Sequence, residues 1–306
     1  MEYKIYKLTF PNGVHFGKNS LESTQYVFQA DTFFSSLCIE AIHRGEESLE
    51  RLLAYVKQDK LAFSDALPYI GKEYYIPKPM LHIENNNQGD SVIKKAFKKM
   101  AFVPFSCFEE YLRGELSKEK AEGLGKLGYS QTKVSAFVRG EDETMPYRVG
   151  IYYYREDCGL YLIVRYGEET VREFFEELLD GLAFSGIGGK RNTGLGRFDF
   201  FRYEVPVKMR ERLEKTEGCL MTLSVSLPTE EELEAVLHEA SYLLEKRSGF
   251  VASESYAKEQ MRKKDLFVFQ SGSCFNKSFQ GGVYDVSAGG RHAVYRYAKP
   301  LFMEVT

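Results

Sequence analysis

Apolar and polar residues follow each other along this chain in two periods, one of two residues and one of about 3.6, which are typical of strands and helices. Residues 3–10 alternate and end at the turn Pro11-Asn12-Gly13, which predicts an opening strand. Residues 168–184 carry apolar side chains three and four positions apart, which predicts an amphipathic helix. Further helices are expected at 31–44, 49–56 and 229–238. Further strands are expected at 61–63, 74–76, 134–138, 147–154, 160–166, 198–205, 219–226, 266–270 and 293–305.

Strands separated by single helices indicate an α+β fold in each half of the chain. Residues 1–206 fit a βαββαβ order when the irregular stretch at about 81–128 is treated as an insertion. Charged residues dominate 207–218, which we interpret as a connector. Residues 219–306 then form a second unit.

The formal net charge of −3 over 306 residues limits what a nucleic-acid site can look like. Proteins that bind nucleic acids without selectivity usually carry a strongly basic surface, so any polyanion site here must be local. Five scattered cysteines without a C-x-x-C pair fit reduced thiols better than a disulfide framework or a zinc site, and we expect no metal or other cofactor. The start of the chain does not resemble a secretion signal, and no apolar run reaches the roughly 18–20 residues that span a bilayer, so we expect a cytoplasmic protein without membrane contact.

A glycine-rich segment at 186–197 carries the strongest chemical signal. Five of its first eleven residues are glycine, which allows positive φ angles and lets backbone amides approach an anion closely. Its three basic residues are accompanied by no acid, and its Asn and Thr side chains can bond sugar or phosphate oxygens. A sugar–phosphate backbone therefore suits the segment, although a purely structural glycine turn after a helix stays an alternative.

Two phosphate-binding motifs are excluded by spacing. The Walker pattern requires Ser or Thr after Gly-Lys, whereas Arg191 follows Lys190. The dinucleotide fingerprint follows a strand and needs a glycine at position 191, whereas this segment follows a predicted helix.

The segment resembles the G-x-G-G-x-[RK]-x-x-G-x-G loop of the RAMP superfamily of CRISPR proteins. The residues at the fixed positions of that loop are Gly186, Gly188, Gly189, Arg191, Gly194 and Gly196. Within the superfamily the chain is similar to the family of subunit four of the type III-A (Csm) interference complex. The stretches that carry this similarity run in order along nearly the whole chain, at 30–38, 74–79, 247–250, 271–275 and 292–297.

This resemblance implies two ferredoxin-like (RRM-like) domains, the first with an inserted thumb-like hairpin and the second degenerate. It also implies a non-catalytic RNA-binding subunit that holds the repeat-derived 5′ handle of the crRNA in antiviral defence. The implied partners are the crRNA, the large polymerase–nuclease subunit and a backbone RAMP subunit, with target RNA nearby. The stretch at 81–128 falls where the thumb would be.

Four groups of residues are expected to contact RNA. The loop group is Gly186, Gly188, Gly189, Lys190, Arg191, Asn192, Thr193, Gly194, Gly196 and Arg197. His15 and Lys18 are expected beside the loop, and Arg291 and His292, with Arg296, on the second domain. The lysine group is Lys94, Lys95, Lys98 and Lys99, for which a solvated helix face is the ordinary alternative.

Asp31 stands directly before the first predicted helix. Backbone RAMP subunits use an early aspartate to cut target RNA, which invites a comparison with this residue. A carboxylate at this place is ordinarily an N-cap, so we expect Asp31 to cap the helix.

Two other functions stay open from the sequence. A guide-processing endoribonuclease could use His15 as general acid or base without a metal, provided that Lys190 or a tyrosine lies within hydrogen-bond reach. A discrete, His15-dependent cut in repeat RNA in the presence of EDTA would identify that enzyme. A protein adaptor could instead pack the glycine loop against another subunit, although unpaired cations suit an interface core poorly.

Overall fold

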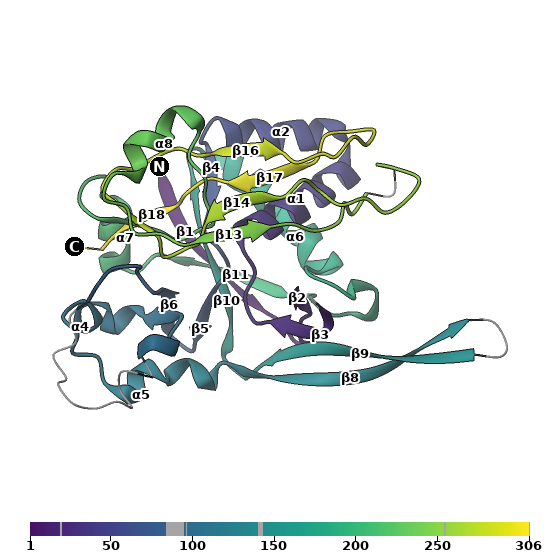
Figure 1. The fold of residues 1–306 in the computed structure, drawn as a ribbon, viewed down its shortest axis with the longest axis horizontal. Helices are drawn as coiled ribbons and strands as arrows, with labels where there is room; N and C mark the ends of the chain where they lie inside the picture. Colours follow the sequence, from purple (N-terminus) through teal and green to yellow (C-terminus); the bar gives the residue numbers. More distant parts are fainter. Residues whose placement is uncertain (19, 84–94, 96, 140–142, 254, 306) are drawn as a thin grey trace.

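A seven-stranded sheet with antiparallel neighbours lies at the centre of the protein (Figure 1). This computed structural model describes residues 1–18, 20–83, 95, 97–139, 143–253 and 255–305. The strands of the sheet are β1 (Glu2–Thr9), β4 (Leu61–Phe63), β5 (Leu67–Ile70), β6 (Glu73–Pro77), β7 (Phe102–Pro104), β10 (Cys158–Tyr166) and β11 (Asp199–Glu204). Their order is β11-β1-β10-β5-β6-β7, and β4 also pairs with β10. The α+β class expected from the sequence is confirmed.

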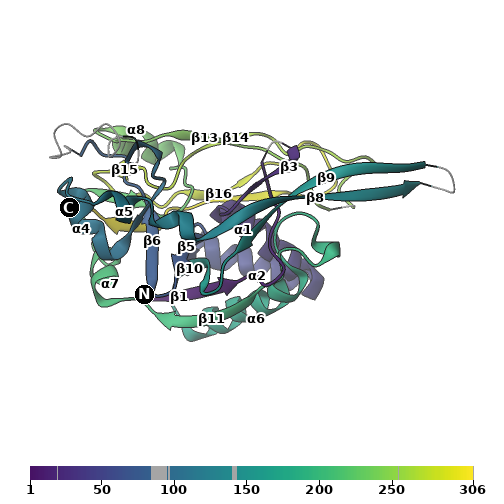
Figure 2. The ribbon, with the colours of Figure 1, turned by 90° about the horizontal axis from the view of Figure 1, so that it is seen from below.

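Three helices pack against one face of the sheet, namely α1 (Ala30–Arg44), α2 (Glu46–Lys57) and α6 (Glu169–Ser185). Side chains alternate along a strand, so Leu160 and Leu162 of β10 belong to the core under these helices, whereas Tyr161 and Ile163 belong to a second core. Figure 2 shows the helices gathered on that one side of the sheet. The central strands are thus buried on both faces of the sheet, and the loops that follow these strands start from fixed positions.

The second half of the chain covers the opposite face of the sheet. Met221, Leu223 and Met303 pack there with Ile163 in one buried cluster. The elements of this half are α7 (Val207–Leu213), β12 (Leu220–Thr222), α8 (Glu230–Leu237), β13 (Leu244–Arg247), β14 (Leu266–Phe269), β15 (Cys274–Phe275), β16 (Gly282–Asp285), β17 (Tyr295–Ala298) and β18 (Phe302–Glu304). They form one three-stranded sheet, β15-β12-β18, and two hairpins, β13-β14 and β16-β17.

Several predicted elements are confirmed and others are shorter than expected. The helix predicted at 168–184 is α6, and the acidic helix at 229–238 is α8, which begins in a capping box between Thr229 and Glu232. The strand predicted at 293–305 is divided into β17 and β18, because Pro300 between them has no N–H to donate to a ladder. The charged stretch at 207–218 contains α7, which buries Met209 and Leu213.

A long hairpin projects from the body and is formed by β8 (Gly128–Arg139) and β9 (Glu143–Tyr154), which pair over their full length (Figures 1 and 2). The thumb-like hairpin was expected within 81–128, where the described residues instead pack onto the body. Strand β7 pairs with β6, and helix α4 (Phe108–Leu112) buries Phe108 and Tyr111. The alternating patterns at 134–138 and 147–154 predicted two strands, but not that these strands pair with each other and project from the body.

Along the described ranges, no helix combines the length and the apolar character needed to cross a membrane.

Candidate nucleic-acid interface

The glycine-rich loop begins where α6 ends and closes on itself. Gly186 follows the helix with a φ of +80°, and its N–H donates to the carbonyl oxygen of Leu182 at 2.7 Å. The N–H of Ile187 donates to the carbonyl oxygen of Gly196 at 3.0 Å. A Cβ on Gly196 would lie 2.0 Å from the carbonyl oxygen of Ile187, and the φ of Gly196 is +78°. Only glycine fits the crossing point of the loop.

The loop is also fastened to the turn between β1 and the short hairpin β2 (Phe16–Lys18)–β3 (Ser20–Gln25). The N–H of Gly189 donates to the carbonyl oxygen of His15 at 2.9 Å, and the N–H of Gly196 to that of Gly13 at 3.0 Å. A Cβ on Gly188 would lie 2.7 Å from the carbonyl oxygen of His15. The glycines therefore serve a structural purpose that the sequence left as an alternative.

Part of the loop backbone stays available to an external anion. The N–H groups of Gly188, Lys190, Arg191 and Asn192 donate to no acceptor among the described residues. Three of these amides are consecutive, and Lys190 adopts a left-handed φ of 58°. Left-handed residues beside right-handed ones turn successive amides toward the same side, which is the geometry of an anion nest. The stretch whose amides are available to an anion is thus shorter than the whole segment.

The three cations of the loop keep their charges free. Within the described chain, no Asp or Glu lies within ion-pair distance of Lys190, Arg191 or Arg197. The Lys190 ammonium lies 4.5 Å from the centre of the Tyr147 ring of β9, and the Arg197 guanidinium lies 5.0 Å from that of Phe184. Aromatic rings orient a cation without neutralising it, so the charges can still attract phosphate.

His15 lies beneath the loop and is only 5% exposed. Its Nδ1 lies 2.7 Å from the carbonyl oxygen of Gly150, which can only accept, so Nδ1 carries the proton in this contact. A Cβ on Gly189 would lie 2.7 Å from His15 Cδ2, so the ring fills the space that this glycine leaves. His15 supports the loop and shows no hydrogen bond to a lysine or tyrosine in the described residues.

A groove of about 380 Å³ runs beside the loop and joins the two halves of the chain. Its walls come from the loop, from the start of α1 and from the turn after β13. The lining residues with charged side chains are Asp31, Arg191, Arg247, Lys263 and Arg296. Four bases against one acid give the groove a local positive charge although the whole chain is acidic.

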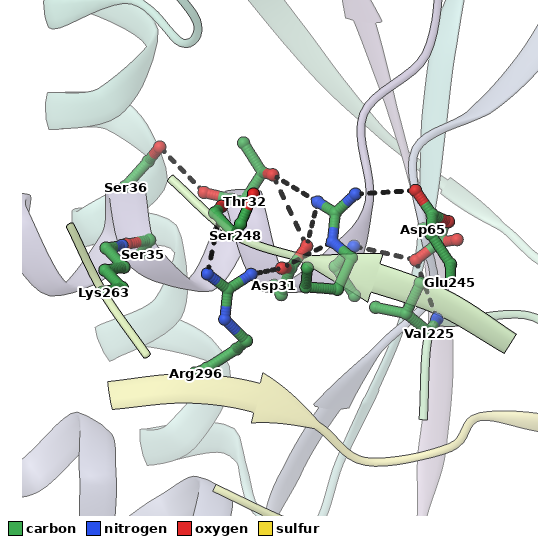
Figure 3. Close-up of polar contacts among 12 residues, drawn as sticks. Asp31, Thr32, Ser35, Ser36, Asp65, Val225, Glu245, Ser248, Lys263 and Arg296 are labelled. Atoms are coloured by element: carbon green, nitrogen blue, oxygen red, sulfur yellow. Dashed lines mark hydrogen bonds and ion pairs between the residues drawn. The ribbon is translucent and has the colours of Figure 1, made fainter. Parts of the chain in front are cut away.

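The floor of the groove is a buried bridge between Asp31 and two arginines of the second half (Figure 3). Arg247 donates from Nε to Asp31 Oδ2 at 2.9 Å and from Nη2 to Oδ1 at 2.7 Å. Arg296 donates from Nη1 to Oδ2 of the same carboxylate. Burial opposes ionisation of Asp31, but the two guanidinium groups hold the pKa of its carboxyl below the usual range.

The expectation that Asp31 caps the first helix is wrong. The N-cap is Gln29, and Asp31 is the second residue of α1 with both oxygens bound to arginines. The N-terminus of the helix is bound from elsewhere, because Asp65 Oδ1 accepts the N–H of Ala30 at 2.8 Å and that of Val225 at 3.1 Å. Local spacing favours a cap, but arginines brought in by the tertiary fold supply stronger charge-assisted bonds.

Asp65 gives the fold a pH dependence that can be measured. Burial raises the pKa of its carboxyl to about 7, although hydrogen bonds from Ala30, Val225 and Ser271 partly oppose the rise. Between pH 4, near the ordinary pKa of an aspartate, and about pH 7, the folded protein holds a proton on Asp65 that the unfolded chain has released. Stability therefore falls as pH rises through this window.

The variant Asp65→Asn keeps an oxygen acceptor at this position without the charge. We expect the variant to unfold at higher denaturant than the wild type at pH 8 and at about the same denaturant at pH 4, and an equal difference at both pH values would contradict this pKa.

Lys263 and Ser35 also line the groove, beside the bridge between Asp31 and the arginines. Lys263 Nζ donates to Ser35 Oγ at 3.3 Å, and burial, together with the nearby Arg296, lowers the pKa of the lysine. Arg296 Nε is buried and has no hydrogen-bond partner in the described part of the chain. Arg296, which the sequence placed on a track for RNA, is thus held in the floor of the groove.

The structure does not bring all of the expected residues together. Lys95, Lys98 and Lys99 are exposed, and Lys98 lines a separate pocket with Lys78 and Tyr111 on the body. Lys94 lies outside the described residues, and Lys18 lies in β2 with its side chain outside the description.

The expected residues of the second half lie outside the groove. Arg291 and His292 are exposed and do not line it. His292 Nε2 lies 2.9 Å from Ser253 Oγ, and its ring packs edge-on against Tyr256.

Sequence reasoning also missed residues that the fold brings to the groove. These are Ser35, Arg247, Phe250 and Lys263. The 247–250 turn carried family similarity, but no spacing rule connects it to a loop some sixty residues earlier. Among the described residues, no three His, Cys, Asp or Glu side chains gather as they would around a metal ion.

The class of protein follows from the fold, the glycine loop and the comparison with known families. The family model of the RAMP superfamily matches residues 36–199, which include α6, the glycine-rich loop and the strands of the sheet from β4 to β10. This α+β chain is therefore a RAMP protein. The model of the CRISPR Csm4 C-terminal domain matches residues 215–305.

Whole-chain relatives narrow the class to one family. The CRISPR system Cms protein Csm4 of Mycobacterium tuberculosis is 39% identical over 305 residues, which cover 99% of this chain and 98% of the relative. The protein of the same name from Streptococcus thermophilus is 35% identical over 315 residues, covering 100% and 99%. The chain belongs to the Csm4 family, the RAMP subunits of type III-A CRISPR (Csm) complexes.

Solved structures show the same fold at low identity. A crystal structure of a Csm3-Csm4 subcomplex in the type III-A CRISPR-Cas interference complex matches with a TM-score of 0.66 at 19% identity and covers 99% of each chain. A Csm1-Csm4 cassette in complex with AMPPNP matches with a TM-score of 0.63 at 17% identity, covering 99% of this chain and 98% of that one.

Proposed function

We propose that this chain is a non-catalytic RNA-binding subunit that holds the 5′ handle of the crRNA along the groove beside the glycine loop. One observation carries the proposal: the free amides of Lys190 and Arg191 and the Lys190 side chain stand beside a groove whose lining, Arg191 included, has four bases and one acid. Backbone amides and basic side chains that converge on a concave surface suit successive phosphates of a single strand. A double-stranded RNA would instead need a broad shallow surface.

The fold supports this function by presenting the loop from a rigid sheet. We propose that residues 1–206 form a ferredoxin-like domain, because β1, α1, β4–β5, β10, α6 and β11 follow the βαββαβ order and pair in the order fourth-first-third-second. The stretch 207–218 then connects to a degenerate second domain at 219–306. The glycine loop lies between the last helix and last strand of the first domain, at the border with the second.

The proposed partners follow from the relatives. Two solved structures that share this fold contain Csm4 with Csm3 and Csm4 with Csm1. We propose that this chain likewise docks a large polymerase–nuclease subunit and a backbone RAMP subunit, with target RNA nearby. In such a complex this chain would lie at the 5′ end of the crRNA, where the handle is.

The loop is tested by the double variant Lys190→Ala/Arg191→Ala in the reconstituted complex. We expect crRNA affinity to fall by about tenfold or more and its salt dependence to become shallower, because two phosphate contacts are lost. A filter-binding titration at several salt concentrations measures both. Lys72→Ala/Lys208→Ala, which removes two exposed lysines that do not line the groove, is the matched control. Full crRNA occupancy in the loop variant would show that the loop assignment is wrong.

The endoribonuclease alternative is not favoured by the site. Its general acid or base would be His15, which is buried and uses Nδ1 to bind Gly150. A proton shuttle for a 2′-OH must lie within hydrogen-bond reach of the RNA, and the loop covers this ring. The alternative of a protein adaptor that packs the loop against another subunit is also not favoured, for a different reason. Cations with no acidic neighbour suit an RNA strand better than the apolar core of a protein interface.

A further inference from the structure

We infer that Phe250, backed by Arg262, is a stacking platform for one unstacked base of the RNA strand in the groove. The inference rests on the proposed function and deepens it, because it assigns a base-binding subsite to a groove so far argued only for phosphates. The ligand class is a nucleobase of single-stranded RNA.

The position of Phe250 is unusual for a large apolar residue. Its side chain is 54% exposed, yet it lines the same groove as Gly188, Gly189 and Arg191. The preceding Gly249 has a φ of +137°, and a Cβ added to it would meet no atom within 4 Å, so the turn that carries the ring is open at this residue. An exposed ring on the wall of a charged groove has an apolar face to offer to a planar ligand.

One side of the ring is already covered by a cation. The guanidinium carbon of Arg262 lies 5.7 Å from the centre of the Phe250 ring. The two residues face each other across a short antiparallel bridge, which is held by bonds from Val251 N–H to Met261 and from Lys263 N–H to Gly249, both at 2.9 Å. Their spacing is therefore set by the backbone. A guanidinium on one face leaves the other face for a base.

The charges around the ring select RNA over a protein partner. Cores of protein interfaces are depleted of charged residues, whereas Phe250 shares its groove with Arg191, Lys263 and the arginine floor. Sites for single-stranded nucleic acids combine a cationic track for phosphates with aromatic rings for bases. In this groove Arg191 and Lys263 supply the track, together with the free amides of the loop beside it, and Phe250 supplies the ring.

The test uses the complete complex assembled around crRNA that carries 2-aminopurine at one handle position at a time. Fluorescence of this base is quenched when it stacks. We expect one position to be quenched with the wild-type chain, Phe250→Ala to restore fluorescence at that position alone, and crRNA affinity to fall about tenfold, since a base–aromatic stack contributes that order of affinity. Phe250→Tyr should keep both quenching and affinity.

The controls separate this inference from the proposed function. Phe267→Ala removes a ring of β14 that is 56% exposed but does not line the groove, and it should change neither readout. If Arg191→Ala weakens crRNA binding while Phe250→Ala changes nothing, the stacking platform is wrong and the proposed function stands. If neither variant affects crRNA, both fail. If Phe250→Ala releases another subunit with unaltered fluorescence, the ring is a protein contact and the inference is overturned.

Discussion

Asp31→Ala should destabilise the protein by about 3–5 kcal/mol, which is among the largest costs expected for a single change in this chain. The carboxylate is 4% exposed and binds Arg247 and Arg296 together. Its removal leaves the buried guanidinium group of Arg296 without its ion-pair partner and leaves Arg247 paired with Glu245 alone. Denaturant unfolding of the purified chain, with a shift in midpoint at unchanged slope, measures the loss.

Two further variants show whether the stranded charges cause that loss. Replacing Asp31, Arg247 and Arg296 together by apolar residues of similar size should recover much of the stability, because neither arginine then stays in the groove without Asp31. Glu204→Ala is the surface control: Glu204 pairs with Lys4 and Arg210 but is well exposed, and exposed pairs contribute about 1 kcal/mol or less. An Asp31→Ala variant within about 1 kcal/mol of the wild type would refute the bridge as a fastening between the two halves.

Gly196→Ala should open the glycine loop and strongly reduce crRNA binding. An alanine at this φ of +78° costs about 1–2 kcal/mol, and its Cβ would in addition collide with the carbonyl oxygen of Ile187 at 2.0 Å. Together with the overpacking cost, we expect about 3 kcal/mol or more. Since the loop connects α6 to β11, the collision displaces the free amides next to Arg191. Unfolding experiments and crRNA titration measure the two consequences.

Two other glycines calibrate this prediction. Gly194 also has a positive φ, +86°, but its Cβ would meet only one atom, at 3.9 Å, so Gly194→Ala should show the backbone cost alone. Gly125 has no positive φ and open space around it, so Gly125→Ala should change little. The expected order of effects is Gly196, then Gly194, then Gly125. Equal effects at Gly196 and Gly125 would contradict the crossing geometry of the loop.

Much of this site could be predicted from the sequence because its signals are local. A run of glycines and cations at 186–197 is contiguous, and both the turn after a helix and the absence of an acid can be seen directly in the letters. Helix α6 before it was predicted correctly because six apolar residues recur at helical spacing and are all buried. The same logic failed for Asp31, since a cap is a local argument and its real partners lie more than two hundred residues away.

The projecting hairpin of β8 and β9 shows the same difference between local signals and tertiary structure. Alternation marked the strands of β8 and β9, but not which of them would leave the body, because projection depends on what the rest of the chain covers. The described residues of 81–128 instead found partners in β6 and the second core.

The sequence by itself determined the α+β class, the principal helices and a cationic glycine loop, because these follow from periods and turns of neighbouring residues. Only the tertiary structure decided that Arg247, Phe250 and Lys263 stand in one groove with Arg191. It also decided that several of the loop amides close the loop itself or bind it to helix α6 and to the turn at 13–15. The physical reason is that a binding groove is made by packing distant segments together, and packing is governed by complementary shape and charge that no short window of sequence contains.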